Sequence, residues 1–236
     1  MKKILITGFS GDLGIYLGKH YLSKNFIVYG HYNKMNKKIK EIKKKFVNLK
    51  LIKSDFTKSN AYKLIDNQIN TKIDILINCV GTPIKRESFE NLDDVIIKKI
   101  FEINFFQFFY LLRNLFKKRK LSKESIIINI SSIASRKPSE DSIHYSLSKN
   151  LSENFSNIIS PILNKRKIRI INIAPNLILN NFQKKYSTKN RIKKTLRITP
   201  LKKAVNESEI LELIDLLVSK KLYNISGETI YLNGGR

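Results

Sequence analysis

The feature that most constrains this chain is a recurring alternation of short β-branched runs with longer segments of helical periodicity. Parallel neighbouring strands need crossover connections, and these connections are usually helical. The pattern therefore predicts an α/β fold, a Rossmann-type doubly wound parallel sheet of about seven strands with helices on both faces. The expected strands are residues 2–7, 26–31, 49–54, 73–78, 125–131, 168–174 and 229–233.

The 236 residues suffice for one large α/β domain. No repeat, linker or shift in composition divides the chain, so we expect a single domain over residues 1–236. The apolar run near the amino terminus is too short for a signal peptide. The longest apolar stretch, residues 100–116, carries Glu102, Asn104, Gln107 and Arg113, which argues against a membrane span.

A net charge of +26 raises nucleic acid or an anionic membrane as partners. The lysines are spread along the chain and accompany abundant Ile and Asn, which indicates a compositional bias on solvated faces. We therefore expect neither nucleic-acid nor membrane binding, and steering of an anionic substrate remains the alternative use of this charge. Cys79 is the only cysteine and the three histidines are scattered, so we expect no disulfide, no metal site and a reducing cytoplasm.

A glycine-rich turn follows the first expected strand directly, in the stretch "TGFSGDLG". Glycine is needed where the chain turns sharply and where its backbone approaches a pyrophosphate at a helix N-terminus. The turn therefore predicts a dinucleotide site. Its expected cofactor-binding residues are Gly8, Phe9, Ser10, Gly11, Asp12, Leu13 and Gly14.

The end of the second expected strand bears on the choice of cofactor. An acidic residue there binds a free ribose 2′-hydroxyl, whereas a basic residue suits a 2′-phosphate. The stretch "GHYNKMNKK" contains no acid, and Lys34 lies close to the strand end. NADP(H) is therefore favoured over NAD(H).

Tyr145 precedes Lys149 by four positions, in a segment where Leu147, Leu151, Phe155, Ile158 and Ile162 recur at helical spacing. The pair then lies on one helix face, one turn apart. In a chain so rich in lysine, chance alone yields about one or two such pairs. An exposed polar pair on a surface helix is therefore the alternative interpretation.

With these pieces in place, the chain resembles the short-chain dehydrogenase/reductase family, in its compact single-domain subtype, over nearly its whole length. "TGFSGDLG" is similar to the family's glycine turn, with Gly11 one position early. "NISS" ends in Ser132, thirteen residues before Tyr145, which is the spacing of the family's catalytic serine and tyrosine. By resemblance the catalytic residues are Asn104, Ser132, Tyr145 and Lys149, and further cofactor contacts are Asp55, Phe56, Asn78, Cys79, Gly81, Tyr145, Lys149 and Ile178.

The resemblance implies reduction of a ketone to a secondary alcohol, or the reverse, with Tyr145 as proton donor. A free tyrosine has a pKa near 10, and we expect the neighbouring Lys149 ammonium to lower it. By resemblance Lys149 also binds the nicotinamide ribose. Ser132 would bind the substrate oxygen, and Asn104 would hold a water that supplies protons.

The substrate stays open at this stage. Residues 177–200 and the loop 133–143 are polar and basic, so a small or carrier-bound anionic carbonyl compound fits. The resemblance favours 3-oxoacyl-[acyl-carrier-protein] reductases, with a keto-sugar enzyme of surface-polysaccharide synthesis as the alternative. A rival of another class is a non-catalytic dinucleotide-binding or scaffolding homologue. By resemblance we expect a homotetramer or homodimer built on the helices of 92–118 and 144–164.

Overall fold

A seven-stranded sheet forms the centre of the computed structural model, which describes residues 1–236. Every pair of neighbouring strands is parallel, in the order β3-β2-β1-β4-β5-β6-β7. The predicted doubly wound α/β fold is thus confirmed. The strands are β1 (Lys3–Thr7), β2 (Ile27–Tyr32), β3 (Leu49–Lys53), β4 (Ile73–Asn78), β5 (Leu121–Ile130), β6 (Arg169–Pro175) and β7 (Thr229–Leu232).

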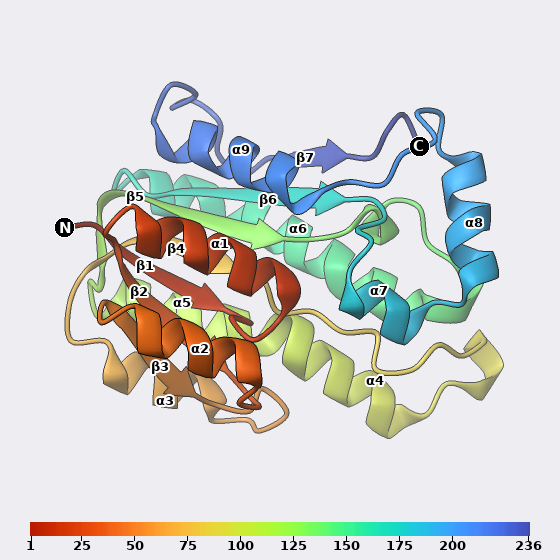
Figure 1. The fold of residues 1–236 in the computed structure, drawn as a ribbon, viewed down its shortest axis with the longest axis horizontal. Coiled ribbons are helices and arrows are strands. Elements are labelled where there is room, and N and C mark those ends of the chain that lie inside the picture. Colours follow the sequence, from red (N-terminus) through yellow and green to blue (C-terminus); the bar gives the residue numbers. More distant parts are fainter.

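Helices cover both faces of the sheet (Figure 1). Because side chains alternate along a strand, Ile4 and Ile6 of β1 join one apolar cluster while Leu5 joins the other. The first cluster includes residues of α1 (Asp12–Ser23), α2 (Lys37–Lys45) and α9 (Glu207–Val218). The opposite layer consists of α3 (Ala61–Gln68), α4 (Asp94–Phe101), α5 (Gln107–Lys117) and α6 (Ile143–Asn164).

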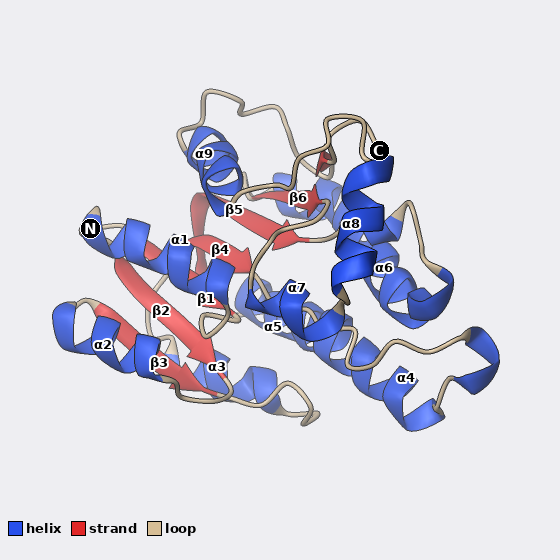
Figure 2. Ribbon diagram, turned by 45° about the vertical axis from the view of Figure 1, so that its right-hand side comes forward, coloured by secondary structure: helices blue, strands red, loops and turns tan.

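The carboxyl ends of the strands point toward the part of the molecule that carries α7 (Asn181–Tyr186) and α8 (Lys189–Ile198) (Figure 1). Figure 2 shows these two helices beyond the ends of β5 and β6. The strand order reverses between β1 and β4, and open α/β sheets bind their ligands in the crevice at such a reversal. The fold therefore directs attention to this edge.

A row of buried polar side chains crosses the sheet near that edge. The side-chain amide of Asn78 donates to the side-chain Oδ1 of Asn129 at 2.8 Å, and the side-chain amide of Asn129 donates to Oδ1 of Asn172 at 2.9 Å. Thr7 on β1 and Thr229 on β7 extend the row at its two ends. A slip of one residue in any strand would turn its member of the row to the other face, so the row specifies the register.

Helix α6 is built differently from the sequence-based expectation. Its buried face carries small polar residues, namely Ser148, Ser152, Ser156 and Ser160. The apolar stripe of the sequence faces outward instead: Ile158 is 72% exposed and Leu147 is 54% exposed. The helix continues through Pro161, which has no N–H to donate to the Asn157 backbone carbonyl; the Ser160 hydroxyl donates to this carbonyl instead.

The region 92–118 was expected to be helical throughout, and it contains an irregularity. A π-helical turn, Glu102–Phe106, separates α4 from α5 and carries Asn104. Such turns occur frequently at functional sites. Three short 3-10 turns complete the structure, at Phe89–Asn91, Ile133–Ser135 and Glu140–Ser142. No helix has the length and apolar character that a membrane crossing requires.

Candidate active site

The glycine turn leaves backbone open at the N-terminus of α1. Gly8 has a φ of +70°, a conformation that favours glycine. A Cβ on Gly14 would lie 2.4 Å from the Gly8 carbonyl oxygen, so only glycine lets the helix pack there. A Cβ on Gly11 would meet only that same oxygen, at 3.4 Å, and would otherwise enter open space. The turn therefore fits a pyrophosphate that lies against the backbone N–H groups.

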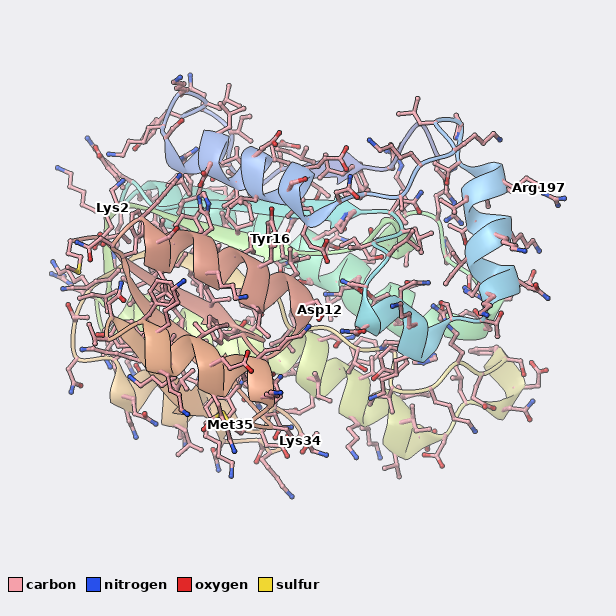
Figure 3. The ribbon with its side chains drawn as sticks, viewed as in Figure 1. Lys2, Asp12, Tyr16, Lys34, Met35 and Arg197 are labelled. Atoms are coloured by element: carbon pink, nitrogen blue, oxygen red, sulfur yellow. The ribbon has the colours of Figure 1, made fainter.

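Asp12 links this turn to α7. Its carboxylate accepts from the Asn181 backbone N–H at 2.8 Å and from the Asn181 side chain at 3.0 Å. Figure 3 shows Asp12 at the end of α1 that faces α7. Partial burial raises the pKa of Asp12, but the hydrogen bonds from Asn181 and Lys38 outweigh this effect and keep it below its usual value. The ionised carboxylate thus holds α7 beside the cofactor turn.

A buried histidine, which the sequence analysis missed, supports the same turn. His31 Nδ1 accepts from the Gly8 N–H at 3.3 Å, and Nε2 donates to the Ser54 carbonyl at 3.0 Å. Burial lowers the pKa of His31 to about 4, which keeps the ring neutral. Its ring stacks on Phe56 with centroids 4.3 Å apart. In the sequence, only the position of His31 at the end of the second strand indicated this role.

Lys149 lies at the ends of two central strands. Its ammonium donates to the Ile130 carbonyl at 2.9 Å and to the Val80 carbonyl at 3.3 Å. A Cβ on Gly81 would lie 2.7 Å from Nζ, so a larger residue at this position would displace the ammonium. The side chain is 3% exposed, and burial lowers the pKa of Lys149 to about 8, although the charge of Glu153 raises it in part.

Tyr145 is half-buried one helical turn earlier, with its ring centroid 6.0 Å from the Lys149 Nζ atom. Burial raises the pKa of Tyr145 to about 12, and a hydrogen bond with Ser132 and the charge of Arg86 offset part of this. We expected Lys149 to lower this pKa, but the structure assigns the lowering to Ser132 and Arg86. The phenol is therefore protonated at neutral pH and available as a proton donor.

One cleft of about 920 Å³ joins these features, and most of the predicted site residues line it. Those that do are Gly8, Ser10, Gly11, Asp12, Leu13, Gly14, Lys34, Asp55, Phe56, Cys79, Gly81, Ser132, Tyr145, Lys149 and Ile178.

Two predicted cofactor contacts, Phe9 and Asn78, lie outside this cleft. Phe9 is fully buried in the core, and its ring fills the space that side chains at Gly18 and Gly30 would need. Asn78 belongs to the polar row of the sheet. Neither side chain faces the cleft, because a position next to a motif does not determine which way a side chain points, and a backbone contact with the cofactor stays a prediction.

A comparison of the sequence with family models gives one match, to the short chain dehydrogenase model over residues 2–191. The chain belongs to this family. It is therefore an oxidoreductase with a nicotinamide-dinucleotide site, and it resembles other short-chain dehydrogenases in sequence and fold.

Several relatives show the extent of the likeness. The chain is 26% identical to a carrot glucose and ribitol dehydrogenase over 178 residues, which cover 75% of this chain and 60% of that protein. A 3-oxoacyl-[acyl-carrier-protein] reductase of Buchnera aphidicola is 27% identical over 69% of this chain and 66% of its own length. Among solved structures, a 4-hydroxyisoleucine dehydrogenase complexed with NADH has a TM-score of 0.90 at 24% identity, covering 100% of this chain and 98% of its own.

Asn104 lies behind the cleft of this short-chain dehydrogenase and not on its surface. Its carboxamide accepts from the Thr82 N–H at 2.9 Å and donates to the Thr82 carbonyl at 3.0 Å and to Ser148 Oγ at 2.9 Å. The side chain joins the π-helical turn to α6 and to the segment after β4. A direct contact with a catalytic water stays a prediction.

Two arginines that line the cleft were not identified from the sequence. Arg86 follows β4 in a stretch that matches no motif, and its charge acts on Tyr145. Arg191 lies within 177–200, where specificity was expected, but nothing in the sequence distinguished it from the neighbouring lysines. Only the fold brings the two arginines to the same end of the cleft.

The buried ammonium of Lys149 predicts a pH effect on stability. The pKa of Lys149 falls from 10.5 to about 8 on folding, so protonation at low pH destabilises the folded state and this cost disappears as pH rises from about 8 to about 10.5. Between pH 7.5 and 9.5 the wild type should gain about 2 kcal/mol in unfolding free energy relative to Lys149→Met. Urea unfolding of both proteins at both pH values measures this; a constant difference would contradict a buried, titrating ammonium.

Proposed function

We propose that this short-chain dehydrogenase reduces a ketone to a secondary alcohol with Tyr145 as the proton donor. One observation carries the proposal. A protonated phenol, a serine that lowers its pKa in part and a buried ammonium all line a cleft that also contains a glycine turn suited to a pyrophosphate. A purely binding homologue has no use for Ser132 beside Tyr145, which argues against the scaffolding alternative.

The bound nicotinamide supplies the hydride in this reaction. Tyr145 gives its proton to the substrate oxygen, and Ser132 donates a hydrogen bond that stabilises the charge developing on that oxygen. Lys149 is held at the strand ends by the Ile130 carbonyl, and the charge of Arg86 favours the phenolate that remains after proton transfer. The arrangement therefore separates donation of the proton from stabilisation of the resulting anion.

Relatives support two substrate classes at this level. A 3-oxoacyl-[acyl-carrier-protein] reductase and a glucose and ribitol dehydrogenase match the chain at similar identity, 27% and 26%. Both names describe enzymes that interconvert a carbonyl group and an alcohol. A cytoplasmic site of action is part of the proposal, supported by a single free thiol, Cys79.

Replacement of Tyr145 by Phe should lower kcat at least ~100-fold, because the proton donor is removed, while the dissociation constant for NADPH changes little. NADPH oxidation over a panel of ketones, together with quenching of protein fluorescence by NADPH, measures both quantities. Tyr16→Phe, on the exposed side of α1 and outside this cleft, is the matched control. Wild-type rates in the Tyr145 variant would remove this residue from the mechanism.

We further propose that NADP(H) is the preferred cofactor. Lys34, Lys37 and Lys38 line the cleft beyond the end of β2, and no carboxylate belongs to that strand end. A ribose 2′-phosphate would meet these ammonium groups, whereas a free 2′-hydroxyl lacks its usual acidic acceptor.

An acid introduced at Asn33, the cleft-lining residue directly after β2, should reverse this preference. Asn33→Asp would repel the 2′-phosphate and accept from a free 2′-hydroxyl, so the ratio of kcat/KM for NADPH over NADH should fall at least ~10-fold. Steady-state kinetics with both cofactors measures the ratio. Asn91→Asp adds the same charge outside this cleft and should leave the ratio unchanged; an unchanged ratio in Asn33→Asp would speak against the proposed preference.

The outward apolar stripe of α6 supports the proposed homo-oligomer. Leu147, Leu151, Ile158 and Ile162 are all exposed on one helix, beside a group of phenylalanines that α5 and α6 share through Phe155. The serine face of α6 already packs on the sheet, so the stripe has no partner within the chain. We propose that the same face of a second copy covers it.

Ile158→Asp should therefore shift the protein toward monomer, because two such carboxylates would face each other across a two-fold interface. Sedimentation velocity over a range of concentrations measures this. Val47→Asp, at a 93% exposed position between α2 and β3, places the same charge on an exposed loop and should not change the assembly. A wild-type monomer at every concentration would end the proposal.

A further inference from the structure

The two ends of the cleft differ in charge. The carboxylates that line it, those of Asp12 and Asp55, lie at the cofactor end, near the glycine turn and after β3. At the other end, around Tyr145, the charged residues are all basic. They are Arg86, Lys137, Lys149, Lys185, Arg191 and Arg236.

Two of these arginines share a single carboxylate behind the cleft wall. Arg86 Nη1 donates to Asp141 Oδ1 at 3.2 Å, and Arg191 Nη1 donates to Asp141 Oδ2 at 2.6 Å. Arg191 also donates to Ser139 Oγ at 2.7 Å. Asp141 thus orients both guanidinium groups and neutralises only one of their two charges.

Donor groups remain available on both arginines. Arg86 donates through Nε to the Tyr186 carbonyl at 2.6 Å, and no protein group accepts from its Nη2. Likewise, no protein group accepts from Arg191 Nε. Guanidinium groups recognise carboxylates in paired hydrogen bonds, so one carboxylate can satisfy the free donors of both residues.

The backbone next to Arg86 is strained, and a side chain of α6 contacts it. Ile84 has a φ of +54°, which is rare for a β-branched residue and occurs mainly where surrounding structure enforces it. His144, the residue before Tyr145, contacts the Pro83 carbonyl at 3.2 Å and the Lys85 carbonyl at 3.0 Å through Nε2. The position of Arg86 is therefore coupled to that of the catalytic tyrosine.

We propose that Arg86 and Arg191 bind the carboxylate of a small oxo acid whose ketone carbon lies at Tyr145. This inference rests on the proposed function and names its substrate class. Within this arginine pair Asp141 leaves one positive charge, which a carboxylate monoanion balances and a phosphate dianion exceeds. A carrier-bound thioester has no charge near its carbonyl, and so it would leave the two arginines without a partner.

Binding without turnover tests the inference separately from the reaction. In the presence of saturating NADP+, a ketone cannot be reduced, so titration calorimetry reports affinity alone. We expect acetoacetate and 2-oxobutyrate to bind at least ~30-fold more tightly than their methyl esters, with dihydroxyacetone phosphate weaker than the acids. Esters that bind as tightly as the acids, tighter binding of the phosphate, or no binding of either acid would each overturn the proposal.

Matched variants assign the effect to the arginines. Arg86→Gln and Arg191→Gln should each weaken acid binding at least ~10-fold and leave ester binding unchanged, and Arg191→Lys should recover only part of the loss because the paired geometry is missing. Lys194→Gln removes one charge from an exposed position on the same helix and should have no effect. Loss of acid binding in this control as well would point to diffuse charge and overturn the assignment.

Activity then separates the two proposals. If the esters are reduced with NADPH as fast as the acids, the reductase function stands and the anion site is wrong. If the acids bind through the arginines and no ketone is reduced, the anion site stands and the reductase function is wrong. Thermal unfolding of each variant confirms that it is folded.

Discussion

The buried amide row that joins the central strands is the interaction on which the rest of the structure depends. Asn129 in the middle of the row donates both to Asn172 on β6 and to Ser152 on α6, at 2.9 and 2.7 Å. The Ser156 hydroxyl of the same helix donates to the side-chain Oδ1 of Asn172. Unpaired amides are costly in a protein interior, so the sheet register and the position of α6 are determined together.

This coupling explains why α6 has serines on its inner face and leucines and isoleucines on its outer face. Short hydroxyl side chains let the helix approach the strands and hydrogen-bond to the amide row. Lys149 lies one turn before Ser152, and the same approach places its ammonium at the strand-end carbonyl of Ile130. The apolar stripe then faces outward, so the position of Lys149 and the exposure of this stripe are consequences of one packing arrangement.

The cleft has two electrostatic environments along its length. At the cofactor end, backbone N–H groups and lysines face the site of the phosphates, while Asp12 is occupied by Asn181 and Lys38. At the other end, buried or half-buried cations surround Tyr145, whose pKa stays high because burial outweighs the nearby charge of Arg86. A protonated phenol among cations suits the reduction of an anionic ketone, because the cations attract the substrate and the phenol retains its proton.

The sequence by itself determined the sheet and the glycine turn, because strand periodicity and glycine conformation are local properties, and Ser132, Tyr145 and Lys149 were predicted from the family resemblance. It did not determine which residues back the cleft. Phe9 and Asn78 lie beside recognisable motifs yet point into the core and the sheet, and Asn104 is engaged by Thr82 and Ser148. Arg86 and Arg191 are 105 positions apart in the chain and come together only through Asp141. Side-chain direction and long-range pairing depend on packing between elements, so only the tertiary structure decided them.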